Sequence, residues 1–326
     1  MGNRKPLLEV KNLTTYFISF SGERVVKAVD DISFNVHYGE RLAIIGESGC
    51  GKSTTALSIL RVLPPSAQIV AGQLIFEGED LLQKTPQEMS RIRGRSLSMI
   101  LQDTMLSLDP VFTIGDQLGE TLERHMDLRG EGLYQRMRDL ILQVNIPEPD
   151  RRLRQFPHEM SGGMRQRIVG AMAFSCEPKL LIADEATTNL DVTIQLQYLN
   201  LLKDLQAKTG VTLMFITHNL GIVAELCENV IVMYAGKIVE RSPVTDIFDT
   251  PAHPYTKALL QAAFGLHDLS KRKPIPGEPP NLASLPPGCA FHPRCTYAQD
   301  RCQKEEPQEV TIGPNRSARC WYPVKN

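Results

Sequence analysis

The 326-residue sequence lacks two features that would assign a protein to a broad class at once. It has no apolar run of about 18 residues, the length that a membrane-spanning helix needs. It has no excess of either charge, because 36 Lys and Arg stand against 37 Asp and Glu, so no basic field indicates nucleic acid or an anionic membrane. We therefore expect a cytoplasmic protein that reaches a membrane only through a partner.

Length and composition predict two domains, since a domain usually holds about 150 residues. Proline becomes frequent after residue 250, and four of the seven cysteines lie there. We expect a first domain over residues 1–250, with a polar helical insertion at about 103–175. Residues 251–326 are expected to form a small, irregular, Cys-rich second domain.

The most informative stretch is a glycine-rich segment between Arg41–Ile45, a predicted buried strand, and Ser53–Leu63, a predicted helix. Two glycines flanking four residues, the second followed directly by Lys-Ser, fit a phosphate-binding loop. Its amides and the helix N-terminus bind phosphate, while Lys52 reaches the outer phosphates and the Ser53 hydroxyl binds Mg²⁺. The residues that we expect at the nucleotide are Gly46, Glu47, Ser48, Gly49, Cys50, Gly51, Lys52, Ser53 and Thr54.

Other apolar runs predict further strands of the same sheet. Leu180–Ala183 reads as a strand buried on both faces that ends in Asp184 and Glu185, and we expect these carboxylates at the sheet edge beside the loop lysine. Two more buried strands each precede a polar side chain: Ser98–Leu101 before Gln102, and Thr212–Thr217 before His218. Together they predict an α/β fold with a phosphate-loop NTPase core.

Short alternating segments add antiparallel strands around this core. A final hairpin is predicted over Val230–Tyr234 and Lys237–Glu240. Ahead of the loop, three strands are predicted as an antiparallel β subdomain: Leu8–Thr14, Val25–Val29 and Ile32–Val36.

A second glycine motif, Ser161-Gly162-Gly163 followed by Gln166, precedes the acidic strand. In this order the motifs resemble the ATP-binding cassette (ABC) family, over roughly residues 7 to 250. The family's other positions are matched by Gln102, the turn Asn189–Asp191 and His218.

Closer still, the chain is similar to the dipeptide and oligopeptide importer subgroup. The segments that carry this similarity are Gln102–Pro110, Ala183–Thr193 and His253–Thr256. Five residues depart from the usual pattern: Met160, Thr104, Ala186, Asn189 and Asn219. None of these changes removes a charged or phosphate-contacting group, so they bear on turnover more than on ATP binding.

The resemblance implies a role for each matched residue in ATP hydrolysis. Phe17 would stack on adenine, with Tyr16 as the alternative. Mg²⁺ would be arranged by Ser53, Gln102 and Asp184. Glu185 would polarise the attacking water, and His218 would contact the γ-phosphate. The signature residues Ser161, Gly162, Gly163 and Gln166 would contact ATP held by a second cassette in a head-to-tail dimer.

The family also implies partners: a second and different cassette subunit, two membrane permeases and an external substrate-binding protein. A homodimer stays open. The chain would sit on the cytoplasmic face of the inner membrane as a peripheral subunit, without binding nucleic acid. Four side chains are candidates for permease contacts, although they are equally plausible as core: Met105, Leu106, Val111 and Phe112.

Three other functions are compatible with the motifs. One is an importer subunit for nickel or another small solute, and a second is a soluble cassette acting on nucleic acid or the ribosome. The third is a regulatory cassette that binds ATP without turnover, which intact Glu185 and His218 disfavour.

The four C-terminal cysteines are Cys289, Cys295, Cys302 and Cys320. Stable disulfides are rare in cytoplasmic proteins, and the spacing is too long for a usual structural zinc site. We therefore favour four thiolate ligands of a 4Fe–4S cluster, with zinc or no metal as alternatives. The subgroup's C-terminal extension points the same way.

Overall fold

The structure is a computed structural model that describes residues 5–102, 107–186, 192–264 and 273–324. The chain divides into two compact units, each built from several segments. The first unit comprises 1–5, 37–40 and 83–215, and the second comprises 6–36, 41–82 and 216–326. The second unit therefore combines the N-terminal strands with the C-terminal region, and the boundary expected near residue 250 stays a prediction.

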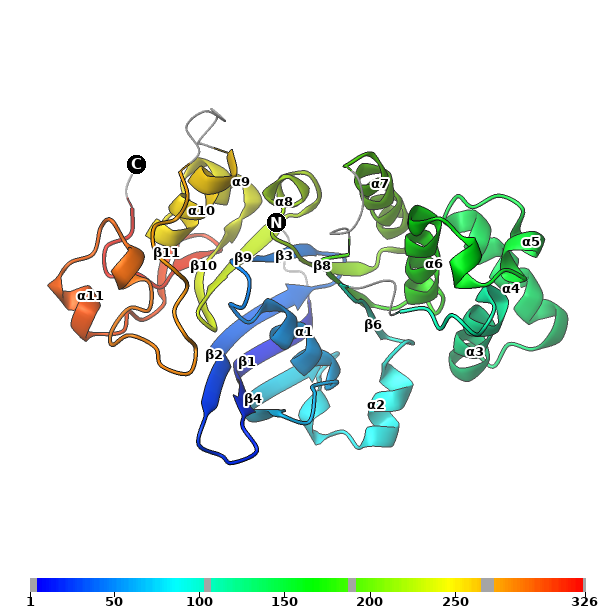
Figure 1. The fold of residues 1–326 in the computed structure, drawn as a ribbon, viewed down its shortest axis with the longest axis horizontal. Helices are drawn as coiled ribbons and strands as arrows, with labels where there is room; N and C mark the ends of the chain where they lie inside the picture. The colour runs from blue at the N-terminus through cyan, green and yellow to red at the C-terminus, as the bar shows by residue number, and fades with distance from the viewer. Residues whose placement is uncertain (1–4, 103–106, 187–191, 265–272, 325–326) are drawn as a thin grey trace. The chain divides into compact units, whose positions relative to one another are not determined.

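An antiparallel sheet in the order β2-β1-β4-β5 forms one part of the second unit (Figure 1). Its strands are β1 (Pro6–Ile18), β2 (Val25–His37), β4 (Ala67–Phe76) and β5 (Glu79–Asp80). The predicted break inside β2 is wrong, because Asp30 and Asp31 bond to the neighbouring strand β1 instead of turning the chain. Asp30 accepts a hydrogen bond from the Tyr16 hydroxyl at 2.9 Å, and Asp31 accepts one from the Asn12 amide at 2.8 Å.

The second unit also contains a mixed sheet in the order β11-β12-β10-β9-β3. Its strands are β3 (Arg41–Ile45), β9 (Asn229–Tyr234), β10 (Lys237–Pro243), β11 (Val310–Gly313) and β12 (Arg316–Ala318). β3 pairs parallel with β9, and β12 adds antiparallel to β10. The C-terminal region thus extends this sheet.

Short helices complete the second unit. They are α1 (Lys52–Leu60), α8 (Leu220–Leu226), α9 (Val244–Asp249), α10 (Pro254–Phe264), η4 (His292–Arg294) and α11 (Asp300–Lys304). Tyr234 of β9, Tyr255 of α10 and Phe291 pack into one buried cluster, with ring centroids 4.6 to 5.3 Å apart. This aromatic cluster fixes the C-terminal region against β9, whose parallel neighbour β3 leads into the glycine-rich loop.

The first unit contains buried strands in the order β8-β7-β6 and a helical region. The strands are β6 (Leu97–Ile100), β7 (Leu180–Asp184) and β8 (Thr212–Ile216). The helices are η1 (Leu81–Gln83, which straddles the boundary), α2 (Pro86–Ile92), α3 (Ile114–Met126), α4 (Gly130–Gln143), α5 (Pro149–Leu153), η2 (Pro157–Glu159), α6 (Gly162–Phe174) and α7 (Val192–Thr209). Helices α3 to α6 lie within the range where the sequence predicts a helical insertion, and capping boxes at Thr85 and Thr113 begin α2 and α3.

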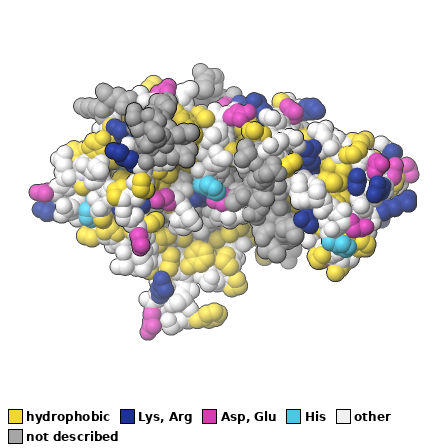
Figure 2. Space-filling model, turned by 45° about the horizontal axis from the view of Figure 1, so that its top comes forward, with side chains coloured by type: hydrophobic (Ala, Val, Ile, Leu, Met, Phe, Trp, Pro, Cys, Tyr) yellow, Lys and Arg dark blue, Asp and Glu magenta, His cyan; other side chains and the backbone are white. Residues whose placement is uncertain are grey.

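The surface of the helical region carries both charges side by side, as Figure 2 shows for one face of the molecule. In α4 and α5, Arg138 pairs with Asp150 at 2.8 Å, and Arg151 pairs with Glu148 at 3.1 Å. Such exposed pairs contribute little stability and present no field of one sign. None of the helices among the described residues is both long and apolar enough to cross a membrane.

Candidate nucleotide site

The glycine-rich loop runs from the end of β3 to the start of α1, as the sequence predicts. Gly46, Gly49 and Gly51 adopt φ of 153°, 77° and 107°, a backbone region that favours glycine. A Cβ on Gly46 would overlap the Met233 carbonyl oxygen, and one on Gly51 would overlap that of Ala28. Glycine is therefore required at both positions by conformation and by space.

The lysine of the loop is folded back onto the loop itself. Lys52 is buried, and its Nζ donates hydrogen bonds of 2.9 Å to the carbonyl oxygens of Gly46 and Glu47. Cys50 is buried nearby, 3.8 Å from Nζ, and burial raises the pKa of its thiol. The ammonium group is thus held inside the loop, where a phosphate oxygen can replace the carbonyls as its partner.

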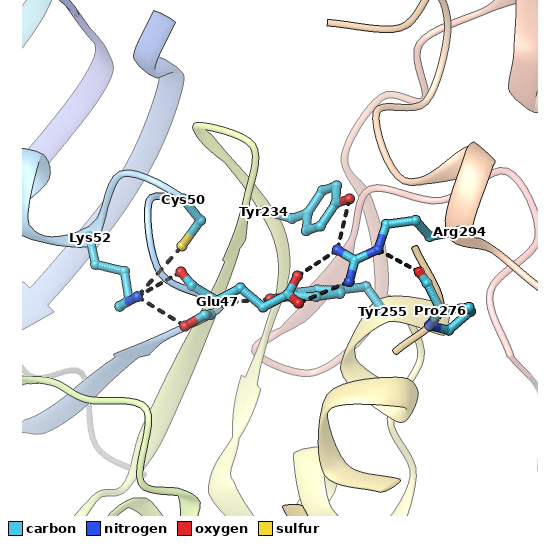
Figure 3. A network of polar contacts seen from close by, with 8 residues as sticks. Glu47, Cys50, Lys52, Tyr234, Tyr255, Pro276 and Arg294 are labelled. Carbon is cyan, nitrogen blue, oxygen red and sulfur yellow. Dashed lines mark hydrogen bonds and ion pairs between the residues drawn. The ribbon is translucent and has the colours of Figure 1, made fainter. Parts of the chain in front are cut away.

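Glu47 of this loop is held by the C-terminal region, which sequence reasoning missed. Figure 3 shows its carboxylate meeting Arg294, whose Nη1 and Nη2 donate hydrogen bonds of 2.7 and 2.9 Å. The backbone N–H of Glu47 donates to the Tyr255 hydroxyl at 2.8 Å. Arg294 lies 247 positions along the chain from Glu47, and no local pattern signals such a pair.

Strand β7 of the first unit is the predicted strand that leads into Asp184 and Glu185. Asp184 closes β7 and is buried, while Glu185 follows with φ of 44°. A non-glycine residue in this left-handed region is uncommon and marks stored strain that functional sites tolerate. Glu185 accepts a hydrogen bond of 2.8 Å from the Gln102 side chain. Two of the predicted site residues thus meet directly.

The signature segment begins helix α6. The Ser161 hydroxyl caps this helix by accepting a hydrogen bond from the Met164 amide at 3.3 Å, and Ser161 and Gly162 are exposed. Gln166 is instead buried, and its amide donates to the carbonyl oxygen of Ala186. Within this chain, the Gln166 side chain therefore holds the backbone of Ala186, the residue that follows Glu185.

The remaining nucleotide candidates lie in the second unit. His218 is exposed, just before Asn219 caps helix α8. Phe17 is half-buried in β1. The ring of its neighbour Tyr16 lies 5.8 Å below the Lys27 ammonium, and burial together with Asp30 raises the pKa of the Tyr16 hydroxyl to about 12. These contacts engage the Tyr16 side chain, so Phe17 remains the preferred candidate for stacking on adenine.

The permease candidates that can be placed are exposed. Val111 and Phe112 have relative exposures of 70% and 52%, far above core values, so the core interpretation is wrong for both. Both side chains are accessible for the expected permease contact, although isolated exposed apolar side chains are also normal on protein surfaces. Several predicted positions lie outside the described residues: Thr104, Met105, Leu106 and Asn189–Asp191.

The four C-terminal cysteines line one small cavity in the second unit. Burial raises the pKa of the Cys289 thiol to about 11 and that of Cys320 to about 12. Four convergent thiols are a donor set that suits a 4Fe–4S cluster, but the cavity measures only about 10 Å³. Among the described residues, no group of three or more His, Cys, Asp or Glu side chains is placed to hold a metal ion. The expected cluster is therefore not supported with the side chains in these positions.

Comparison with known proteins identifies two regions of the chain. The family described as ABC transporter matches residues 29–188, and the oligopeptide/dipeptide transporter C-terminal region matches residues 239–302. A probable peptide ABC transporter ATP-binding protein of Sinorhizobium fredii is 47% identical, covering 97% of this chain and 94% of the relative. The dipeptide transport ATP-binding protein DppD of Bacillus subtilis gives the same identity and coverage.

A solved structure supports the fold. A dimeric ATP-binding cassette in a post-hydrolysis state with ADP and Pi superposes with a TM-score of 0.64 at 24% identity, over 73% of this chain and 98% of that one. The chain belongs to the ATP-binding proteins of ABC transporters and is an ATPase of that family. It carries, in addition, the C-terminal region of the oligopeptide/dipeptide group. The resemblance drawn from the motifs is confirmed.

Proposed function

We propose that this chain is the ATP-hydrolysing subunit of an importer of dipeptides or oligopeptides. The observation that carries the proposal is a glycine loop closed on Lys52 in a chain that also matches the oligopeptide/dipeptide C-terminal region. Relatives named for dipeptide and oligopeptide transport share 47% and 45% identity with it. A nickel or other small-solute importer is the second candidate.

In this function the loop amides and Lys52 bind the β- and γ-phosphates of ATP. Ser53, Gln102 and Asp184 are the residues that would hold Mg²⁺, and the ion would supply charge neutralisation at the phosphates. Glu185 accepts a proton from the attacking water, and the Gln102 amide fixes the position of its carboxylate. His218 contacts the γ-phosphate, and Phe17 stacks on adenine.

The exposed start of α6 supports the proposed dimer. Ser161 and Gly162 present backbone N–H groups at a helix N-terminus, an arrangement that suits the phosphates of ATP held by another cassette. We propose a different but related chain as this second cassette. Two permeases would dock at the surface that includes Val111 and Phe112, on the cytoplasmic face of the inner membrane, and an external binding protein would deliver the peptide.

Isolation of the complex from native membranes tests this function. The chain is extracted with mild detergent, captured, and its companions are identified by mass spectrometry. Two permease subunits, a second cassette and ATP hydrolysis that rises with peptide-loaded binding protein are the expected result. Capture of ribosomes or DNA, or stimulation by nickel instead of peptide, would contradict it. The variant Lys52→Ala, which should lose hydrolysis, controls for a contaminating ATPase.

We also propose that Cys289, Cys295, Cys302 and Cys320 hold a 4Fe–4S cluster. The convergence of the four thiols on one cavity supports it, and binding would require the side chains to open that cavity. Iron and acid-labile sulfide are measured in protein purified without oxygen, alongside Cys302→Ser. Equal amounts of both, lost in the variant, are expected; zinc, or no metal, would contradict the proposal.

A further inference from the structure

The phosphate-binding loop contains an acidic residue at its second position. The Glu47 side chain leaves the loop toward the C-terminal region, and Figure 3 shows its carboxylate turned to Arg294 and away from the Lys52 ammonium. This side chain is only 24% exposed, so water screens its charge poorly. A negative charge here needs an explanation, because the same loop is expected to attract phosphate.

Electrostatics predicts that Glu47 alone would oppose nucleotide binding. A carboxylate roughly 8 Å from a phosphate charge, at the effective dielectric constant of a protein surface, weakens binding by about thirtyfold, and screening by salt reduces this effect toward about tenfold. A guanidinium bound to both carboxylate oxygens cancels this field and holds the side chain in one position. Arg294 makes this bidentate pair and supplies the compensating charge.

Arg294 is itself fixed in place before any nucleotide binds. Its side chain is 5% exposed, its Nε donates to the Pro276 carbonyl at 2.9 Å, and its Nη1 also donates to the Tyr234 hydroxyl at 3.3 Å. The bonds to Glu47 raise the pKa of the guanidinium, so it stays charged. An arginine held at every nitrogen loses little entropy in keeping Glu47 paired.

The segment that carries Arg294 belongs to the Cys-rich region. Arg294 ends the short helix η4 and directly precedes Cys295, while Phe291 of the aromatic cluster lies three residues earlier. The same cluster supplies Tyr255, which binds the Glu47 amide. Both the side chain and the backbone of Glu47 are therefore held from the C-terminal region.

We propose that Arg294 is a positioning residue of the nucleotide site, through which the C-terminal region raises ATP affinity by neutralising Glu47. This inference rests on the proposed binding of ATP at the loop. It concerns affinity and not the chemical step, because Arg294 touches Glu47 and not the reacting atoms.

The test removes the charge of Arg294 and of Glu47 in turn. It uses the full-length chain in its complex. ATP affinity is measured by displacement of a fluorescent ATP analogue, and KM and kcat by phosphate release. Arg294→Gln is expected to raise Kd and KM about tenfold with kcat within about twofold. Glu47→Gln removes the unfavourable charge and is expected not to weaken binding. The double variant should return to within about twofold of the unmodified chain.

Control variants separate charge from folding. Arg301→Gln removes an exposed pair with Glu305 in the same region and should leave Kd unchanged. Arg294→Lys keeps the charge and should retain most of the affinity, while circular dichroism checks that every variant is folded.

Three results would overturn the proposed role of Arg294. Equal weakening by Arg294→Gln and Glu47→Gln, or a double variant as weak as Arg294→Gln, would show a packing role and overturn the inference. So would unchanged affinity in Arg294→Gln. Failure of the unmodified chain to bind ATP at all would instead overturn the proposed function, and this inference with it.

Discussion

Glu47 and Glu185 both follow the carboxyl end of a buried strand, yet their surroundings differ. Glu47 lies two residues after β3 and meets the cationic guanidinium of Arg294 at two oxygens. Glu185 lies directly after β7, in a left-handed backbone conformation, and accepts a hydrogen bond from the neutral amide of Gln102. An amide orients a carboxylate without cancelling its charge, whereas a guanidinium cancels it.

The partner of a carboxylate, more than its place in the chain, therefore determines which chemical role suits it. A base needs its negative charge to accept a proton, so an orienting amide suits Glu185. A carboxylate near phosphates must be neutralised, so an arginine suits Glu47. Two residues of one type thus meet opposite electrostatic requirements, each within its own unit.

The largest expected effect comes from Glu185→Gln. Loss of the carboxylate should lower kcat by about 10³-fold or more with ATP affinity retained, since general-base catalysis contributes on this scale. Phosphate release and nucleotide binding measure the two quantities. Glu177→Gln is the matched control, because Glu177 also has a left-handed backbone, with φ of 52°, but pairs with Arg136 at the surface. Unchanged turnover in Glu185→Gln would assign the base elsewhere.

The second effect is on stability. Glu47→Gln leaves the buried Arg294 without its carboxylate and should cost about 2 kcal/mol, between the values for an exposed pair and for a fully buried one. A fall in melting temperature of several degrees is expected. Glu148→Gln removes an exposed partner of Arg151 and should shift the transition by less than about one degree. A similar shift in both variants would make Glu47 an ordinary surface glutamate.

Strands and loop conformations were largely predictable. β3 and β7 consist of almost fully buried apolar runs, whose position in a sequence is evident, and the glycine loop needs backbone conformations that only glycine adopts easily. The strand break expected near Asp30 failed because a polar pair reads as a turn. In the fold, these side chains find partners on β1 that no sequence window contains.

Long-range polar pairs were not predictable. Arg294 stands in a Pro-rich segment where an arginine has no periodic pattern, and its partner becomes evident only once the aromatic cluster brings η4 close to β9. Gln166 gives a second case. Its predicted contact with a partner's nucleotide stays a prediction, and no local pattern indicates that its amide donates to Ala186 of the same chain.

A third, smaller effect tests the orienting amide. Gln102→Ala should lower kcat by about tenfold while KM for ATP changes less, because removing a group that fixes a catalytic side chain costs about 1.4 kcal/mol. Phosphate release at saturating ATP measures it. Gln135→Ala is the control, since it removes an amide that donates to Asp139 on the surface of α4. A drop in affinity without a drop in kcat would show that Gln102 does not orient Glu185 for catalysis.

The smallest effect concerns the second attachment of Glu47. Tyr255→Phe deletes the hydroxyl that accepts a hydrogen bond from the Glu47 backbone N–H, leaving that part-buried N–H without its partner, at a cost of about 1 kcal/mol. We expect ATP affinity to fall about threefold to fivefold, less than in Arg294→Gln, because only a neutral contact is lost. Tyr134→Phe removes an exposed hydroxyl bound to Asp150 and should have no effect. If Tyr255→Phe weakened ATP binding more than Arg294→Gln, loop geometry and not charge would be the main contribution of the C-terminal region.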